Sequence, residues 1–426
     1  MKNINNPQRK DWSQILERPT KTVEDIEKTV NQIFGDVQKN GDAAVKKYTQ
    51  LFDGVSLDNV IVSIEEINEA ITEVSSELKD AINLAKENIT KFHTAQKTDK
   101  VFVETTKGVS CWQEKRPIQK VGLYIPGGTA PLFSTVLMLA IPAQIAGCKE
   151  IVLCSPPNKE GKIHPAILYT ANLCGVTKII KVGGIQAIAS FTFGTETVPK
   201  VYKIFGPGNQ FVTVAKQLST KYGIAIDMPA GPSELLVVAD NKANASYVAS
   251  DLLSQAEHGA DSQVILVSTS KKLIDEVTLE IKKQLLELPR IQIAQKAIEN
   301  SKSIFVENDE IALELINEYG PEHFIVCTNN NDFYVDNIKN AGSVFIGNYT
   351  PESAGDYASG TNHTLPTNGF SKSYSGVNLD SFTKSITFQE INKEGIQIIG
   401  KSIELMAAAE GLEAHKNAVS IRLKDL

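Results

Sequence analysis

The sequence predicts an α/β fold built on parallel sheets, because short apolar runs alternate with helical stretches from about residue 120 onward. These runs fit buried strands: Val121–Ile125, Ile151–Cys154, Ile179–Val182, Val201–Phe205, Leu235–Ala239, Val264–Val267, Ile304–Val306, Phe324–Cys327 and Val344–Ile346. Ligands of such sheets bind at the carboxyl ends of the strands. The flanking regions, residues 20–100 and 378–426, are predicted to be mostly helical.

The two helical regions each carry an apolar side. In the first region it is formed by Val23, Ile26, Val30, Ile33, Phe34 and Val37. In the last it is formed by Ile403, Met406, Ala407 and Leu412. One-sided stripes of this kind are typical of helices that pack against a core. We therefore interpret the first region as scaffold.

Length and composition indicate an ordinary soluble globular protein. The chain has 426 residues, of which 42% are hydrophobic and 22% charged, enough for two or more compact units. The net charge of -7 argues against nucleic acid as the main partner, because no excess of Lys and Arg is available to neutralise phosphates. No apolar run is long enough for a membrane span.

Two further observations favour a cytoplasmic protein. The stretch from Met1 to Thr20 is polar and lacks the apolar core of a secretory signal. The cysteines are odd in number, scattered and mostly set in apolar runs, which is typical of reduced thiols: Cys111, Cys148, Cys154, Cys174 and Cys327. Because none is paired at ligand spacing, a metal site would have to use His, Asp, Glu or Gln.

Three glycine-rich turns follow predicted strands, at residues 125–128, 182–186 and 205–209. Each places bare backbone amides at the start of a helix, where a pyrophosphate binds well. For any single turn, the simpler interpretation is that glycine closes a tight connection. The dinucleotide fingerprint is absent, since Phe211 stands at the third glycine position.

The block from Ile226 to His258 combines a turn, a buried strand and a candidate metal-binding helix end. Apolar periodicity predicts a helix from Asn241 to His258, and Gly259 provides a stop. Gln255 and His258 would then share one helix face. On composition alone, such a pair at a helix end is more typical of a solvated surface.

Further candidate residues lie between the later strands. Glu322 and His323 follow a Gly-Pro turn and offer two proton acceptors on a restrained backbone. Neighbours in a strand point to opposite faces, so both side chains serve one pocket only if the turn twists the backbone between them. A polar connection without a catalytic role is equally compatible with the sequence. A long polar loop holds Asp356 and His363 as functional candidates. Glu410, taken alone, fits an exposed surface position.

These residues resemble the histidinol dehydrogenase family along essentially the whole chain. The matching blocks are Ile226–His258, Gly320–His323, Gly355–His363 and Glu410–Asn417. The first block matches the family signature at almost every fixed position, which makes it highly specific. The first hundred residues match by length and helical character more than by motif.

The resemblance implies a site for zinc, substrate and NAD. Zinc, one ion per subunit, would be held by Gln255, His258, Asp356 and His415. Substrate contacts would include these four residues together with Ser233, His323, His363 and Glu410. NAD would contact Tyr124, Gln186 and Asn209, which lie at the three glycine-rich turns.

The implied reaction is oxidation of L-histidinol to L-histidine by two NAD through L-histidinaldehyde, the last steps of histidine biosynthesis. His323 would act as proton acceptor in both hydride transfers. Glu322 would help to activate the water that hydrates the aldehyde. The metal residues alone also permit a zinc hydrolase with Glu322 as general base. A second alternative is a related dehydrogenase of the same superfamily that oxidises another small polar alcohol, such as a sulfonated diol. A third is a non-enzymatic metal-binding module, which would not require a paired Glu and His at the entrance to a strand.

The resemblance also implies a domain organisation with two incomplete Rossmann-like units, one inserted in the other. Residues 1–22 would form an N-terminal arm. Residues 23–123 and 235–377 would form a discontinuous zinc and catalytic domain, and residues 124–234 the inserted NAD-contacting domain. Residues 378–426 would form a helical segment that reaches the partner's site in a homodimer, so that Glu410 and His415 act in trans.

Overall fold

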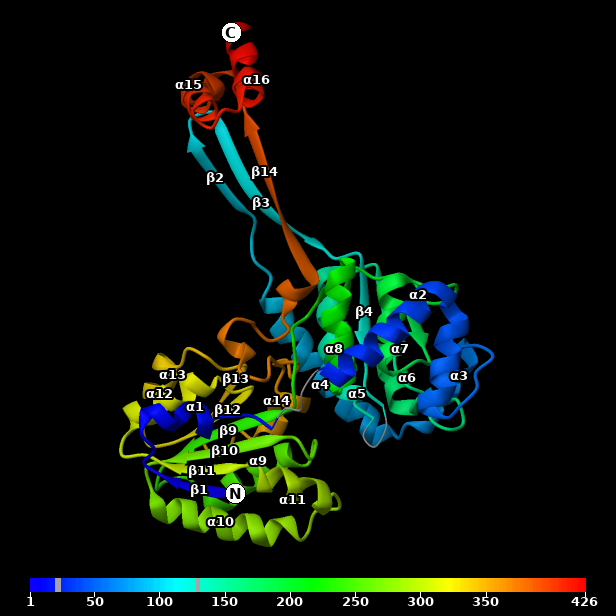
Figure 1. Ribbon diagram of the computed structural model, residues 1–426, viewed down its shortest axis with the longest axis vertical. Coiled ribbons are helices and arrows are strands. Elements are labelled where there is room, and N and C mark those ends of the chain that lie inside the picture. The colour runs from blue at the N-terminus through cyan, green and yellow to red at the C-terminus, as the bar shows by residue number, and fades with distance from the viewer. Residues whose placement is uncertain (20–23, 128–130) are drawn as a thin grey trace.

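The computed structural model describes residues 1–19, 24–127 and 131–426 and contains two parallel sheets and one antiparallel sheet (Figure 1). The strands expected from residue 120 onward are all present, with ends shifted by one or two residues. The predicted α/β class with parallel sheets is confirmed. Residues 20–23, which include the predicted apolar Val23, and Gly128 of the first glycine-rich turn lie outside the described residues.

The larger parallel sheet has six strands in the order β1-β11-β10-β9-β12-β13. Its strands are β1 (Lys2–Asn5), β9 (Glu234–Ala239), β10 (Gln263–Ser268), β11 (Lys302–Phe305), β12 (His323–Cys327) and β13 (Ser343–Ile346). The central strands β9, β10 and β12 are buried on both faces, which explains their continuous apolar runs. The N-terminal arm is fixed to the fold because β1 pairs with β11 and forms one edge of this sheet.

Helices cover both faces of this sheet. They are α1 (Trp12–Ile15), α9 (Ala245–Ala256), α10 (Lys271–Leu285), α11 (Ile291–Glu299), α12 (Asp309–Tyr319), α13 (Asn331–Asn337) and α14 (Glu352–Tyr357). One core cluster joins α9, α10 and α11 to the sheet, and another joins α1, α12 and α13. Helix α9 is shorter than the predicted helix from Asn241 to His258: it ends at Ala256, so His258 lies just beyond it.

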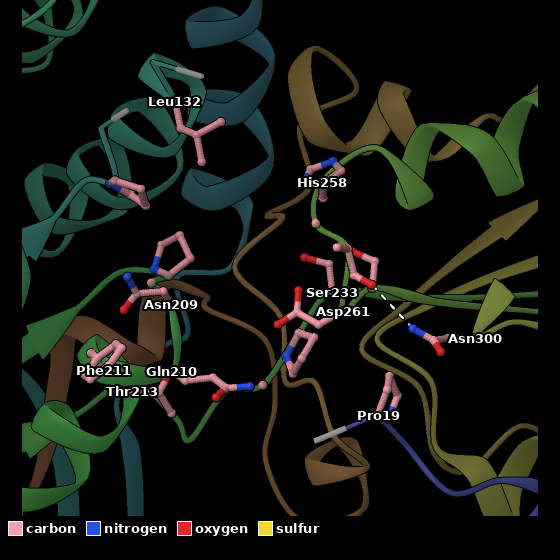
Figure 2. A pocket seen from close by; sticks show the side chains of 18 residues that line it. Pro19, Leu132, Asn209, Gln210, Phe211, Thr213, Ser233, His258, Asp261 and Asn300 are labelled. Atoms are coloured by element: carbon pink, nitrogen blue, oxygen red, sulfur yellow. Dashed lines mark hydrogen bonds between the residues drawn. The ribbon is translucent and has the colours of Figure 1, made fainter. Parts of the chain in front are cut away.

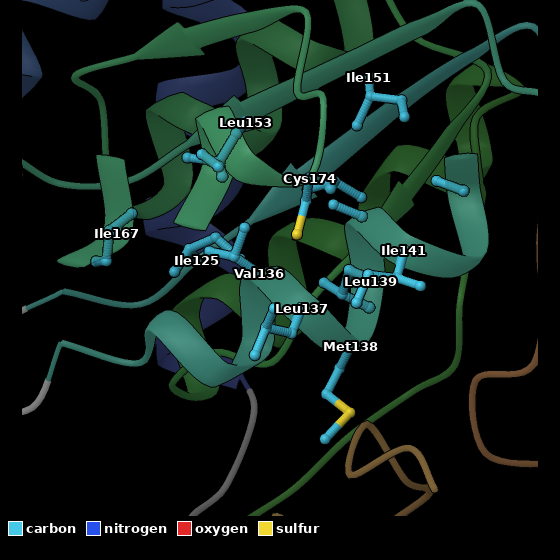
Figure 3. Close-up of a cluster of buried hydrophobic side chains, with 14 of the residues drawn as sticks. Ile125, Val136, Leu137, Met138, Leu139, Ile141, Ile151, Leu153, Ile167 and Cys174 are labelled. Carbon is cyan, nitrogen blue, oxygen red and sulfur yellow. The ribbon is translucent and has the colours of Figure 1, made fainter. Parts of the chain in front are cut away.

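The smaller parallel sheet has five strands in the order β6-β5-β4-β7-β8. Its strands are β4 (Lys120–Tyr124), β5 (Glu150–Cys154), β6 (Lys178–Ile180), β7 (Lys203–Phe205) and β8 (Ala225–Ile226). Its connecting helices are α5 (Phe133–Ala146), α6 (Pro165–Leu173), α7 (Gly184–Phe193) and α8 (Gln210–Ser219). Figure 3 shows the core around α5, where Leu137, Leu139 and Ile151 are among the buried side chains. The five strands fall between β1 and β9 in the chain.

The helical region before this unit packs against the smaller sheet. It consists of α2 (Glu24–Asp53), α3 (Ile64–Glu73) and α4 (Ser76–Ala95). The stripe of α2 shares a core cluster with α7 and α8, while α4 shares one with α5. This packing differs from the predicted grouping of residues 23–123 with 235–377. The amphipathic stripes predicted helices correctly, but a stripe does not specify which sheet it covers.

A long antiparallel sheet projects away from both parallel sheets (Figure 1). It contains β2 (Val101–Thr106), β3 (Val109–Pro117) and β14 (Thr383–Ile391), and it carries α15 (Lys393–Ala409) and α16 (Glu413–Lys424) at its far end. The prediction that residues 378–426 are helical is therefore wrong for β14. Both faces of β2 are solvent-exposed, so the alternation that marks a half-buried strand is absent.

Among the described residues, each helix is too short or too polar to cross a membrane.

Candidate active site

A cleft of about 730 Å³ opens between the two parallel sheets. Pro207, Gly208 and Asn209 line it from the turn before α8. Ser233 and His258 line it from the side of the larger sheet (Figure 2). The cleft therefore lies where the sequence predicted ligands, at the carboxyl end of β7 in the smaller sheet.

The predicted Glu322–His323 pair lies on the larger sheet, where β12 begins. The Glu322 carboxylate accepts the backbone N–H of Glu234 at 2.8 Å. Nδ1 of His323 lies 3.2 Å from the Glu234 carbonyl oxygen and 3.6 Å from the Glu322 carboxylate. Because β12 starts at His323, Glu322 is free of strand geometry and its side chain turns toward the imidazole. The structure thus brings the pair together.

The tautomer of His323 follows from these contacts. The Glu234 carbonyl oxygen only accepts hydrogen bonds, so Nδ1 carries a hydrogen and donates to it. In the neutral ring Nε2 is then an acceptor. Among the described residues Nε2 is buried without a hydrogen-bond partner, 3.8 Å from a carboxylate oxygen of Asp356. A buried base with a free lone pair is unusual in a purely structural corner.

Beside this pair, the ligand atoms of His258, Glu352 and Asp356 all lie within 4.8 Å of one another. Gln255 is buried next to them. With its amide nitrogen toward Glu352, it donates to that carboxylate, and its oxygen accepts the Glu234 N–H at 2.9 Å. Nitrogen and carboxylate oxygen donors at this separation suit a zinc-sized divalent cation.

The sequence reasoning missed Glu352, which lies in the cluster. It stands four residues before Asp356 in α14, so both carboxylates project from one side of that helix. The i, i+4 spacing of two acidic residues in a predicted functional loop was the available signal. Glu352 is 1% exposed, and one of its carboxylate oxygens has no hydrogen-bond partner among the described residues.

His363, another predicted candidate, joins the same cluster from the loop after α14. Its Nδ1 lies 2.9 Å from the backbone carbonyl oxygen of Asp356. Its Nε2 lies 3.1 Å from the hydroxyl of Thr135, which belongs to α5 beside the smaller parallel sheet. His363 therefore connects the two units beside the metal-competent cluster.

The electrostatics of the cluster are dominated by burial and by its carboxylates. Burial lowers the pKa of His323, but Glu352, Glu322 and Asp356 outweigh it and raise that pKa to about 10. Burial raises the pKa of Glu352 well above its usual range. A divalent cation among these groups would oppose both shifts, because its charge stabilises carboxylates and disfavours a protonated imidazole.

The three predicted NAD-contacting residues occupy different environments. Asn209 lines the cleft and caps α8 by accepting the N–H of Val212 at 3.1 Å. The Tyr124 hydroxyl accepts the Gly184 N–H at 3.2 Å, and this tyrosine is 5% exposed. Gln186 is 1% exposed, and neither polar atom of its side chain has a partner among the described residues. Tyr124 and Gln186 thus lie together at the second glycine-rich turn, beneath the surface.

The remaining predicted residues lie far from this cleft. Glu410 follows α15 and His415 belongs to α16, and both are exposed at the end of the antiparallel sheet (Figure 1). Within one chain the structure does not bring them to the cluster.

The fold and the site define an α/β enzyme with two Rossmann-like units and a carboxylate–histidine cluster suited to a divalent metal. A model of the histidinol dehydrogenase family matches residues 16–423. The chain belongs to the histidinol dehydrogenase family.

Relatives match over almost their full lengths. Histidinol dehydrogenase of Bacteroides thetaiotaomicron is 59% identical over 426 residues, which is 100% of both chains. The Escherichia coli protein of the same name is 54% identical over 416 residues, covering 97% of this chain and 95% of its own. A crystal structure of histidinol dehydrogenase from Elizabethkingia anophelis has a TM-score of 0.98 and 56% identity, and covers 100% of this chain and 98% of that chain.

Proposed function

We propose that this protein oxidises L-histidinol to L-histidine through L-histidinaldehyde, using zinc and two molecules of NAD, as the last steps of histidine biosynthesis. The observation that carries the proposal is the Glu322–His323 pair beside a metal-competent cluster, in a chain that matches the family from residue 16 to 423. A cytoplasmic location fits the five free thiols, because such thiols persist in a reducing compartment.

His258 and Asp356 would hold zinc together with Gln255, and His415 of a second subunit would complete the set. The donor chemistry fits the ion, because the cluster gathers imidazole and carboxylate groups and leaves a buried carboxylate oxygen of Glu352 without a partner. When bound, zinc supplies an electrophilic centre that orients the substrate's nitrogen and oxygen atoms. Ser233, His363 and Glu410 would add polar contacts to the amino alcohol.

NAD would bind along the turn that holds Asn209, with Tyr124 and Gln186 at the neighbouring turn. Backbone amides at the start of α8 suit its pyrophosphate. Glycine is required in these turns: Gly206 has φ +124°, and a Cβ there would collide with the backbone oxygen of Tyr124. When bound, NAD supplies the hydride acceptor.

The chain's own residues would move the protons. With a divalent cation bound, which opposes the rise in the pKa of His323, the neutral ring would accept the hydroxyl proton at Nε2 as the first hydride leaves, while Nδ1 donates to the Glu234 carbonyl oxygen. Glu322 then takes a proton from the water that hydrates the aldehyde. His323 serves again when the hydrate is oxidised. The carboxylates of Glu322, Glu352 and Asp356 near the imidazole stabilise its charged form between these steps.

The experiment that tests this function counts NADH formed per L-histidinol consumed by zinc-loaded protein. We expect two NADH per substrate, because alcohol to carboxylate is a four-electron oxidation. Chelation should abolish the reaction and added zinc should restore it. NADH formation with other small polar alcohols but not L-histidinol would point to a related dehydrogenase. Zinc-dependent hydrolysis without any NADH would point to a zinc hydrolase.

A second prediction separates the two oxidation steps. Glu322→Gln should lower steady-state turnover by about 100-fold and spare alcohol oxidation more, because only hydration of the aldehyde needs a base for water. In a rapid-mixing experiment we expect a fast burst of one NADH per site, followed by a slow phase. Glu318→Gln, an exposed change in the preceding helix α12, is the control. Equal loss in both phases would refute this division of labour.

A further inference from the structure

Arg18, in the N-terminal segment after α1, makes a buried ion pair next to the Glu322–His323 pair. Its guanidinium binds Glu234 in a bidentate manner, with Nε at 2.5 Å from one carboxylate oxygen and Nη2 at 2.9 Å from the other. The two side chains are 15% and 2% exposed. The N–H of Asn368 also donates to the Glu234 carboxylate, at 2.7 Å. Glu234 is thus held firmly at the start of β9.

The same guanidinium fastens the chain that leads into the Glu322–His323 pair. Nη2 donates to the carbonyl oxygen of Tyr319 at 3.0 Å, at the end of α12. The guanidinium carbon lies 4.0 Å from the centre of the Tyr319 ring, a stacking contact that suits arginine. Gly320, which follows, adopts the left-handed conformation that begins the turn into β12. Arg18 therefore joins the starts of two neighbouring strands, β9 and β12.

The peptide groups of Glu234 in turn position both catalytic candidates. Its N–H donates to the Glu322 carboxylate at 2.8 Å. Its carbonyl oxygen accepts from Nδ1 of His323 at 3.2 Å, which leaves Nε2 as the free base. A shift of Glu234 would therefore move the water-activating carboxylate and disturb the histidine tautomer together.

We propose that Arg18 is a positioning residue for the oxidation, acting through Glu234 to hold the Glu322–His323 pair in its reactive geometry. This inference rests on the proposed dehydrogenase function. Arg18 does not touch the reacting atoms, although the next residue, Pro19, lines the cleft (Figure 2). The N-terminal segment is thereby part of the catalytic apparatus as well as an edge of the larger sheet.

The geometry requires arginine specifically. A lysine would keep the positive charge, but it cannot bind both Glu234 oxygens in a fork, donate to Tyr319 and stack on its ring at once. Lysine at position 18 should therefore leave Glu234 paired but less well oriented. Methionine would fill similar space and leave the buried carboxylate without its cation.

The experiment compares Arg18→Lys and Arg18→Met with the unchanged protein, using zinc-loaded dimer and steady-state NADH formation. Misplacement of catalytic groups by about 1 Å costs on the order of 100-fold in rate. We expect kcat to fall about tenfold for Arg18→Lys and about 100-fold for Arg18→Met, with KM for L-histidinol nearly unchanged. Zinc content should stay at one ion per subunit, because Arg18 touches none of the proposed ligands and because Gln255, which accepts the Glu234 N–H, is also held by Glu352.

Arg9→Met is the matched control, because Arg9 belongs to the same N-terminal segment as Arg18 but forms an exposed ion pair, with Glu314 of α12. It should leave kcat unchanged. Thermal unfolding gives the folded fraction of each variant, and assays are run well below its melting temperature. An Arg18→Lys protein with unchanged kcat, or with a loss matched by its unfolded fraction, would overturn the inference. Absence of NADH formation by the unchanged protein would instead reject the proposed function.

Discussion

Replacing His323 with Asn should reduce kcat by about 10²- to 10⁴-fold, the usual contribution of a general base, while L-histidinol still binds. Asparagine can donate to the Glu234 carbonyl as Nδ1 of His323 does, at 3.2 Å in the present structure. It has no nitrogen lone pair with which to replace Nε2. Binding should survive because the metal-competent cluster consists of other residues. Calorimetric titration with L-histidinol and steady-state kinetics measure the two effects separately.

His164→Asn provides the control for a histidine replaced elsewhere. His164 is exposed and caps α6 by accepting the N–H of Ala166 at 3.2 Å, and asparagine is an equally good capping residue. Its activity should match that of the unchanged protein. If His323→Asn kept its kcat and instead lost affinity for L-histidinol, His323 would be a binding group and the proton would leave by another route.

The strands and the helices of the parallel units were predictable from sequence because their burial is nearly complete. Strands such as β9 and β12 are buried along their whole length, so their apolar runs are continuous. The exposed strand β2 gives no such signal: Val101 and Phe102 are each 58% exposed. Strand β14 is likewise exposed along most of its length, which explains why the sequence predicted a helical segment there.

The candidate site was predictable where a motif matched and less so where side chains meet by tertiary packing. Gln255, His258, Asp356 and His363 do gather in one cluster, though they come from two distant stretches of chain. Local sequence left open whether Glu322 and His323 face one pocket. Their juxtaposition depends on the twist before β12 and on the peptide of Glu234, a residue 88 positions from Glu322.

Arg18 had no sequence signal at all, since its partners lie 216 and 301 residues away. Tyr124 and Gln186 show the opposite situation. Both belong to the glycine-rich turns that suggested a pyrophosphate site, yet both side chains are buried. NAD could touch these two side chains directly only if the turn that covers them moved. Of the three predicted residues, Asn209 alone lines the cleft.

Two inactive variants should restore activity to each other if the proposed homodimer shares its sites. His258 lies at the cleft, whereas His415 lies in α16 at the far end of the projecting sheet (Figure 1). If the partner supplies His415, a heterodimer of His258→Ala and His415→Ala subunits contains one site with both changes and one site with neither. Each variant alone should lose zinc and at least about 100-fold in turnover.

Coexpression of the two variants in equal amounts tests this arrangement. Random pairing makes half of the dimers mixed, and each mixed dimer has one intact site of two, so about a quarter of the unchanged specific activity should return. The control mixes His258→Ala with Asp356→Asn. Both residues belong to the same cluster within one chain. Each site of a mixed dimer therefore carries one of the two changes, and no activity should return. Activity of a dilute monomer, or no recovery in the first mixture, would show that His415 does not act in trans.

The same experiment distinguishes a dimer whose subunits share their metal sites from a dimer in which each site is formed by one chain. The projecting sheet and its helices expose apolar side chains that include Phe102 and Met406, which are 58% and 67% exposed. A partner that covered them would explain their exposure in one chain, since large apolar groups on a surface mark an interface. Recovery of zinc together with activity in the mixed dimer would tie that interface to the metal site, because dimerisation without exchange of His415 restores neither.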